Sequence, residues 1–294
     1  MERGWLSSNN ILIQGASSNA LIDSGYCTHA PQTLALVDSA LKGRPLDVLI
    51  NTHLHSDHCG GNAALQAHYP ALQTHIPPGH AEYVRAWDAY ALSYTPTGQS
   101  CPQFSFNATL QPDTEMLLGD LVWQVHAAPG HDPHSVVLFE PVSRTLVSAD
   151  ALWERGFGVV FPELDGIHAF DEVAATLDLI EHLQPVVVIP GHGAPFSDVA
   201  SALAVARKRL AGFVAAPDKH RLYAAKVLLK FKLLEAQALE RDALQAWALG
   251  TSYFAGMLAQ QGGADHAVQA LDSLVRDLVR SGAATVQGNR IFNA

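Results

Sequence analysis

One short run of side chains constrains the fold of this chain more than any other. It reads THLHSDHCGGN over residues 52–62, and it follows the apolar segment Val48–Ile50, which predicts a buried strand. Imidazole and carboxylate groups occupy four of its positions: His53, His55, Asp57 and His58. Such nitrogen and oxygen groups are the ligands that zinc and similar divalent ions prefer. The run therefore predicts a cation site at the end of that strand.

The spacing within this run predicts two groups of ligands. His53 and His55 are two residues apart, so on an extended segment their side chains point the same way. The chain then turns at Ser56, and Asp57 with His58 can address a second ion close by. A chain with 15 histidines can also produce such a string by chance, so the run needs support from elsewhere in the sequence.

Three further turns supply that support, each at the end of a predicted strand. They are APGH at residues 128–131, SAD at 148–150 and PGHG at 190–193, and they supply His131, Asp150 and His192. Proteins with alternating strands and helices gather their functional groups in the turns that follow strands. Taken singly, each residue is more often an ordinary polar turn residue. Together, and in this order, they indicate one site.

The apolar periodicity of the remaining chain predicts alternating strands and helices, and hence a layered α/β architecture. Strands are expected at residues 11–13, 20–23, 48–50, 74–76, 121–126, 135–139, 145–148 and 186–189, the first two as a pair. Helices are expected at residues 30–42, from 62 to about 69, 80–90 and 172–183. Residues 93–112 are rich in Thr, Pro, Ser and Gln, which predicts a surface loop.

The composition changes near Pro217, which predicts a catalytic domain over residues 1–216 and a small domain over residues 217–294. Helical patterns cover residues 222–239 and 264–280, and the second has apolar residues at helical spacing. Residues 284–292 then predict a terminal hairpin. Helices followed by a hairpin indicate a winged-helix-like module.

In this order and context the motifs resemble the metallo-β-lactamase superfamily, and the resemblance covers residues 11–196. It implies an αβ/βα sandwich of two β-sheets flanked by helices. It also implies two divalent ions, expected to be Zn²⁺ with iron or manganese as alternatives. The ligands implied are His53, His55 and His131 for one ion, Asp57, His58 and His192 for the other, and Asp150 as a bridge.

The implied chemistry is hydrolysis. Two ions about 3.5–4 Å apart lower the pKa of a bridging water, provide hydroxide at neutral pH and polarise the oxygen under attack. Asp57 is the expected catalytic residue, because it can hold its metal and orient that hydroxide. The substrate expected is a small anionic acyl-thiol or ester, in a reaction similar to that of glyoxalase II. The alternative is a single-stranded RNA endonuclease, because lactamase-like proteins with a C-terminal winged helix include such a branch.

The net charge of −10 disfavours a protein that coats nucleic acid over its whole surface. Residues 207–232, however, hold eight of the 18 lysines and arginines. This basic stretch is either a solvated helix face or a docking surface for glutathione-type carboxylates, coenzyme A phosphates or RNA. Three cysteines, no leader-like segment and no long apolar run predict a cytoplasmic protein without a membrane partner. The sequence does not define an oligomeric state.

Other residues near the expected ligands have roles that the sequence leaves open. Asp23 is either a partner that orients a ligand histidine or the cap of a turn. Cys59 is expected to be a small buried residue rather than a ligand. Asp132 and His134 are expected to face solvent, with substrate contact as the alternative. The aromatic residues Trp153, Phe157 and Phe161 are expected in the core, or else in a wall that binds an acyl group.

Overall fold

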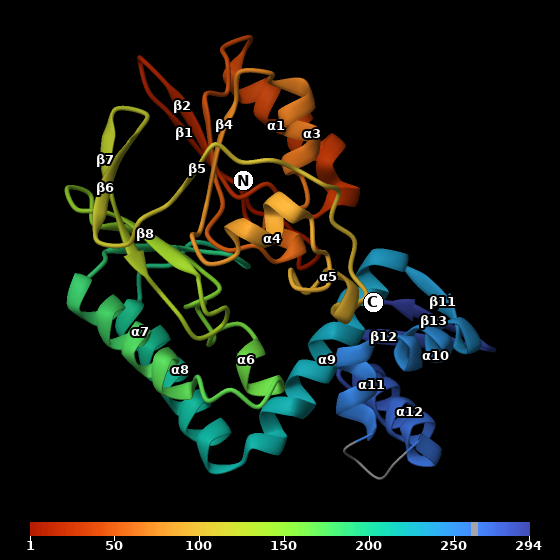
Figure 1. The fold of residues 1–294 in the computed structure, drawn as a ribbon. Helices are drawn as coiled ribbons and strands as arrows, with labels where there is room; N and C mark the ends of the chain where they lie inside the picture. The colour runs from red at the N-terminus through yellow and green to blue at the C-terminus, as the bar shows by residue number, and fades with distance from the viewer. Residues whose placement is uncertain (260–263) are drawn as a thin grey trace.

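The computed structural model describes residues 1–259 and 264–294 and contains two five-stranded sheets packed face to face, with helices on their outer faces (Figure 1). A third, three-stranded sheet lies with the C-terminal helices. The predicted α/β sandwich of two sheets flanked by helices is confirmed. Within the described ranges, no helix is long and apolar enough to cross a membrane.

The first sheet has the order β1-β2-β3-β4-β5, in which β1 and β2 are antiparallel and the later pairs are parallel. Its strands are β1 (Ile11–Gln14), β2 (Asn19–Ile22), β3 (Val48–Ile50), β4 (Gln73–Ile76) and β5 (Ala108–Thr109). Side chains alternate between the two faces of a strand. Leu21 and Leu49 therefore pack with α1 (Ala30–Leu41) and α3 (Asn62–His68), whereas Ile22 and Ile50 face the second sheet.

The second sheet has the order β10-β9-β8-β7-β6, and only its β10–β9 pair is parallel. Its strands are β6 (Thr114–Leu118), β7 (Leu121–Ala127), β8 (Val136–Glu140), β9 (Thr145–Ala149) and β10 (Val187–Pro190). Helices α7 (Phe170–Leu183) and α8 (Val199–Ala215) cover its outer face, at the lower left of Figure 1. Leu138 and Val147 point inward, toward the first sheet.

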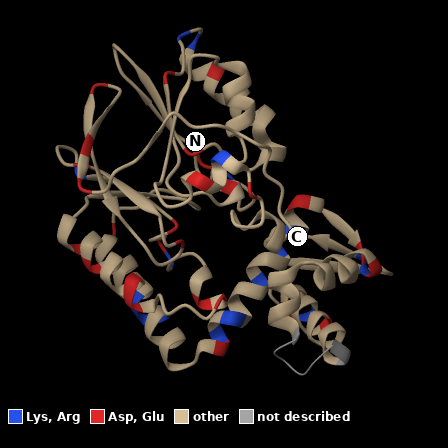
Figure 2. Ribbon diagram, viewed as in Figure 1, with Lys and Arg blue, Asp and Glu red and all other residues tan. Residues whose placement is uncertain are grey.

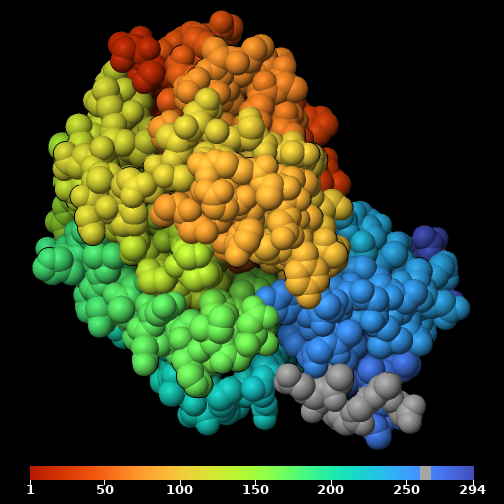
Figure 3. Space-filling view, in the orientation of Figure 1, coloured from red at the N-terminus to blue at the C-terminus, as the bar shows by residue number. Residues whose placement is uncertain are grey.

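The C-terminal part has its own core, and it packs against the catalytic part. Its elements are α9 (Pro217–Ala236), β11 (Ala238–Glu240), α10 (Arg241–Gly250), α11 (Ser252–Ala259), α12 (Ala264–Arg280), β12 (Ala284–Gln287) and β13 (Arg290–Asn293). The predicted terminal hairpin is confirmed, because β12 and β13 pair antiparallel. In Figure 3 this part, in blue, abuts the orange and green segments of the catalytic part. The winged-helix assignment and the boundary at residue 217 stay predictions.

Several predicted boundaries were wrong. The expected loop at 93–112 contains α5 (Tyr94–Thr97) and β5, and it is anchored by the buried rings of Tyr94 and Phe104, which composition alone did not reveal. The helix expected at 80–90 is only α4 (Ala81–Ala86), because the chain leaves helical geometry at Trp87. Strand β6 and helix α8 were not anticipated, and Leu239 lies in β11 rather than in a helix. Three short helices complete the described elements: η1 (Cys27–His29), α2 (Ser56–Cys59) and α6 (Phe161–Leu164).

Much of the basic stretch 207–232 is neutralised by contacts within the chain. Arg207 pairs with acids on α7, and Lys226 lies 2.6 Å from a carboxylate oxygen of Asp277 on α12. Lys230 donates to the carbonyl of Ala283 and to the last two residues of the chain. Figure 2 shows basic and acidic segments side by side along these helices. Lys226 and Lys230 therefore tie α9 to α12 and to the terminal strand.

The first prediction concerns the core of the C-terminal part. Leu274→Ala on α12 removes a side chain that is only 2% exposed, and it should lower the free energy of unfolding of this part by about 2–5 kcal/mol. Val279→Ala on the same helix is the control: that side chain is 40% exposed, and its loss should cost at most about 0.5 kcal/mol. Urea denaturation of both variants measures the difference, and equal losses would contradict the packing described.

Candidate metal centre

The structure brings all seven predicted ligands to one edge of the sandwich. Four of them follow β3, in the segment that enters α2, and the others lie in the loops after β7, β9 and β10. Their ligand atoms form three groups, each with all atoms within 4.8 Å of one another. These groups are His53, His55 and His131; Asp57, His58 and His192; and His53, His58 and Asp150.

The first two groups match the two ligand sets that the sequence predicted. In the first, Nε2 of His131 lies 2.8 Å from Nδ1 of His55 and 3.2 Å from Nε2 of His53. In the second, Nε2 of His192 lies 3.0 Å from Oδ2 of Asp57. Three imidazole nitrogens that face one point form a favourable arrangement for a cation.

Asp150 lies between the two groups and presents one carboxylate oxygen to each. Its Oδ1 is 3.4 Å from Nε2 of His58, and its Oδ2 is 3.5 Å from Nε2 of His131. The carboxylate is nearly inaccessible to solvent, as are both histidines. This placement is the one required of a residue that bridges two ions.

The donor set fits a pair of divalent cations. Nε2 of His58 is buried without a hydrogen-bond partner, although it lies close to the carboxylates of Asp57 and Asp150. A buried polar atom without a partner costs roughly 1–3 kcal/mol, and a coordinated ion would remove that cost. Among the described residues, no lysine or arginine competes for this position with a salt bridge to either carboxylate.

The protonation states also suit metal binding. Burial alone would raise the pKa of Asp150, but His192 and His58 outweigh it and hold the pKa well below its usual range. Burial lowers the pKa of His55 to about 4 and that of His53 well below its ordinary value, so both are neutral at pH 7. Metal ions bind carboxylates and neutral imidazoles, so these states need no prior loss of protons.

His58 is the exception. Burial lowers its pKa, but the carboxylates of Asp23, Asp150 and Asp57 together raise it well above the ordinary value. The surrounding carboxylates therefore favour the protonated form of His58, and binding of metal at this residue should release a proton.

Asp23 holds His58 in place. Its Oδ2 lies 2.7 Å from Nδ1 of His58, so that Nε2 is directed toward Asp57 and Asp150. The backbone N–H and the hydroxyl of Thr52 both donate to the same carboxylate. The left-handed backbone at Asp23, with φ of 58°, turns the side chain toward β3. This contact is the one expected of a partner that orients a ligand histidine.

His131 is oriented by a segment that the sequence did not single out. Its Nδ1 donates to the carbonyl of Val159 at 2.5 Å, which leaves Nε2 facing the other histidines. A Cβ on Gly158 would clash with that Nδ1, so only glycine allows this approach. The neighbouring N–H of Val160 donates to Nε2 of His220 on α9, and this bond links the ligand loop to the C-terminal part.

The other residues that the sequence analysis singled out near the ligands lie either in the core or in the lining of a cavity over the ligands. Cys59 is fully buried against Tyr94, as predicted, and Phe157 is in the core. Asp132 was expected to face solvent, but it is only 5% exposed: the N–H of Phe161 on α6 donates to the carbonyl of the preceding His131, and the Asp132 carboxylate accepts from the N–H of His134. Trp153 and Phe161 line a cavity of about 80 Å³ over the ligands.

Helix α9 and the N-terminal segment close this cavity, and neither was predicted to reach the site. From α9, Val227, Leu228 and Phe231 line it opposite the ligands. From the N-terminus, the ring of Trp5 stacks on His192, with centroids 5.3 Å apart and planes 10° apart. No periodicity or motif in the sequence marks Trp5, which is 55% exposed in the fold.

Comparison with known proteins identifies the family. The model of the metallo-beta-lactamase superfamily matches residues 3–192. The chain belongs to this superfamily. Similar curated proteins are the hydroxyacylglutathione hydrolases of Brucella anthropi, 26% identical over 58% of this chain and 59% of theirs, and of Anaeromyxobacter dehalogenans, 31% identical over 50% and 47%. The chain thus spans about half the length of these relatives.

Solved structures share the fold. A metallo-beta-lactamase family protein from Thermus thermophilus is 20% identical, with a TM-score of 0.57 over 98% of this chain and 94% of its own. A second protein, solved in a di-iron-bound form, is 24% identical, with a TM-score of 0.56 over 70% of this chain and 97% of its own. The match to the first structure extends through the C-terminal part.

The second prediction concerns metal content. Elemental analysis of the purified protein should find close to two divalent ions per chain. Asp23→Asn should weaken metal affinity by about 10–100-fold, because Asp23 orients His58. Asp38→Asn on α1 removes the carboxylate of an exposed pair with His68 of α3 and is the matched control. A stoichiometry of one or less after metal supplementation would contradict the two-ion site.

Proposed function

We propose that the protein is a metal-dependent hydrolase that uses a two-metal site on a small thioester or ester, in a reaction similar to that of glyoxalase II. The observation that carries this proposal is the position of Asp150, with one oxygen toward each ligand group. The hydrolase names of the similar proteins support the reaction class. We assign the ligands as the sequence predicted, with Asp150 as the bridge.

The chain's own residues then have distinct tasks. Bound divalent ions supply acidified water and polarise the oxygen under attack. Asp57 is only partly buried, and its Oδ2 lies 3.0 Å from Nε2 of His192. We assign to its other oxygen the task of accepting a proton from the attacking water and fixing its direction. The apolar side chains of α9 above the ligands exclude bulk water and strengthen these electrostatic contacts.

Zinc is the metal we favour, because the set combines five imidazoles with two carboxylates. Iron and manganese suit the same ligands, and the di-iron-bound neighbour keeps iron as an alternative. We also assign the protein to a reducing, cytoplasmic environment. The three cysteines are free, and the sulfur atoms of Cys59 and Cys101 lie 3.8 Å apart without a bond.

Cleavage of single-stranded RNA is the second candidate, and the order of helices and hairpin in the C-terminal part is the observation that favours it. The charge distribution favours the small substrate. Arg207, Lys226 and Lys232 have carboxylate partners within the chain, so fewer cations remain for phosphates than the sequence suggested.

The third prediction separates catalysis from packing. Asp57→Ala should lower kcat on a cleaved thioester by at least about a hundredfold, because it removes a ligand and the proton acceptor. Cys59→Ala, two residues away, should stay close to wild type because this side chain only packs. The assay pairs a thioester panel with a labelled single-stranded RNA. Efficient metal-dependent RNA cleavage without thioester turnover would replace the proposed function with the second candidate.

The fourth prediction concerns the basic stretch. Replacing Lys226 and Lys230 together with Gln should leave KM and kcat for thioesters almost unchanged. It should lower the free energy of unfolding by roughly 1–3 kcal/mol, because both lysines serve contacts within the chain. Steady-state kinetics and urea denaturation measure the two effects. A steep loss of RNA affinity with unchanged stability would show instead that these lysines bind phosphates.

A further inference from the structure

A second, larger cavity opens directly beside the metal centre. Its volume is about 430 Å³, within the range of small-molecule sites. Trp5, Trp153, His192 and Val227 line both this cavity and the small one over the ligands. The two cavities therefore adjoin at these four residues, and we call the larger one the Trp5 cavity.

One wall of the Trp5 cavity is aromatic and is fixed to the ligands. The ring of Trp5 stacks on His192, and Trp153 packs edge-on against Trp5 with centroids 5.3 Å apart. The indole N–H of Trp153 donates to Oδ1 of Asp150 at 3.2 Å. Trp5 nevertheless stays 55% exposed, an unusual state for a large apolar ring. A flat apolar group placed against it would cover that surface.

The lining of the Trp5 cavity also includes a cation without a carboxylate partner in the described chain. The Arg209 guanidinium lies over the ring of Tyr223, 5.3 Å from its centroid, and donates to the carbonyl of Phe157. Gly156 makes room for it, because a Cβ there would clash with Cζ of Arg209. Arg209 is thus held in position while most of its donors stay available. The exposed side chains Glu154 and Arg155 at the rim oppose each other in charge.

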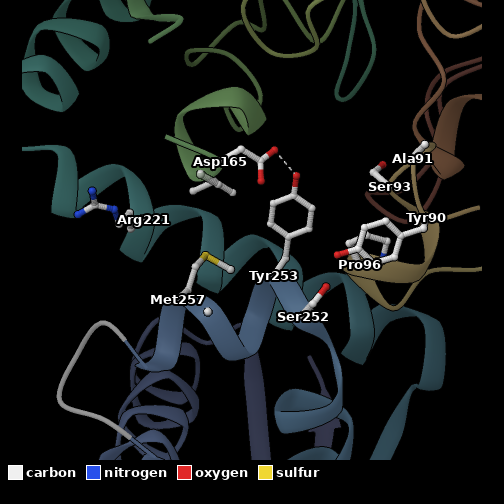
Figure 4. Close-up of a pocket in the computed structure, with 11 residues that line it drawn as sticks. Tyr90, Ala91, Ser93, Pro96, Asp165, Arg221, Ser252, Tyr253 and Met257 are labelled. Carbon is white, nitrogen blue, oxygen red and sulfur yellow. Dashed lines mark hydrogen bonds between the residues drawn. The ribbon is translucent and has the colours of Figure 1, made fainter. Parts of the chain in front are cut away.

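Another cavity of similar volume differs from the Trp5 cavity in that its arginine has a carboxylate partner. Figure 4 shows it, lined by Tyr253, Asp165 and Arg221 among others, with a volume of about 410 Å³. Arg221 pairs with Asp218, and the hydroxyl of Tyr253 donates to Asp165, as the dashed line marks. Its arginine is therefore already neutralised. An anionic group on the substrate finds the better partner in the Trp5 cavity.

We propose that the Trp5 cavity binds a substrate arm that consists of a flat apolar group ending in an anion. Trp5 stacks on the plane of that group, and Arg209 pairs with the anion. This assignment rests on the proposed function, because it concerns the arm of the substrate whose carbonyl the metal centre attacks. It selects aryl thioesters or esters with a terminal carboxylate, sulfonate or phosphate over substrates whose arms are wholly polar.

Isothermal titration calorimetry on the metal-loaded protein tests the cavity without any reaction. The probes are p-toluenesulfonate, methanesulfonate and methyl p-tolyl sulfone, which present ring and anion, anion alone, and ring alone. Sulfonates coordinate divalent ions weakly, so their binding reports the cavity rather than the metals. We expect p-toluenesulfonate to bind most tightly of the three. Equal binding of all three, or none by p-toluenesulfonate, overturns the proposal.

Variants of Arg209 and Trp5 test whether these two residues bind the probe. Arg209→Gln should weaken p-toluenesulfonate about tenfold and Arg209→Lys less, and Trp5→Ala should weaken it by between about twofold and tenfold. Arg221→Gln and Tyr90→Ala remove a cation and an exposed ring from the cavity in Figure 4 and should leave binding unchanged. Trp5 is exposed, so its variant keeps the test valid even if Arg209→Gln unfolds. Wild-type affinity in both Trp5→Ala and Arg209→Lys overturns the proposal.

Measurements of thioester turnover distinguish a failure of the Trp5-cavity inference from a failure of the proposed function. For an aryl thioester with a terminal sulfonate, Trp5→Ala should raise KM and leave kcat and metal content close to wild type. If both Trp5→Ala and Arg209→Gln turn over this substrate like the wild type, the inference is wrong and the proposed function still stands. If p-toluenesulfonate binding depends on both residues but no thioester or ester is turned over, the Trp5 cavity binds an aryl anion as proposed. Only the proposed hydrolase reaction is then contradicted.

Discussion

A buried negative charge organises this molecule. The Asp150 carboxylate lies in a nearly solvent-free position, where an isolated charge is very unfavourable, and histidines on both sides keep it ionised. Those histidines come from the loops after β3, β7 and β10, and Asp150 itself follows β9. The two sheets must therefore pack with these strand ends at one edge. The sandwich and the site are consequences of the same arrangement.

A surrounding set of contacts holds the ligands at defined angles. Asp23 and Thr52 fix His58 from the first sheet, and the carbonyl of Val159 fixes His131 from the loop after β9. That loop is tied in turn to α9, since His220 accepts from the N–H of Val160, and burial lowers the pKa of His220 to about 4, so that it is neutral. Residues far from the ligands in the chain thereby influence the geometry of the site.

The C-terminal part has its own core, and it also lines the cavity over the ligands. Val159 belongs to its hydrophobic core, and side chains of α9 close the cavity over the ligands. Lys226 and Lys230 of α9, which looked available in the sequence, are engaged in holding this part together. We propose that the ligand groups set the class of reaction, whereas these walls select the substrate.

The sequence by itself determined the kind of fold, and it predicted the histidines and aspartates that the fold brings together. Histidines and aspartates in turns after apolar runs mark strand ends locally. The helical spacing of apolar residues likewise predicts α1, α7 and α12. Those signals are local, so they survive without a structure. Only the tertiary structure decided the partners: Trp5 on His192, Gly158 beneath His131 and α9 over the ligands. Each of these joins segments distant in the chain through packing, and packing between distant segments leaves no periodic or spaced pattern in the sequence.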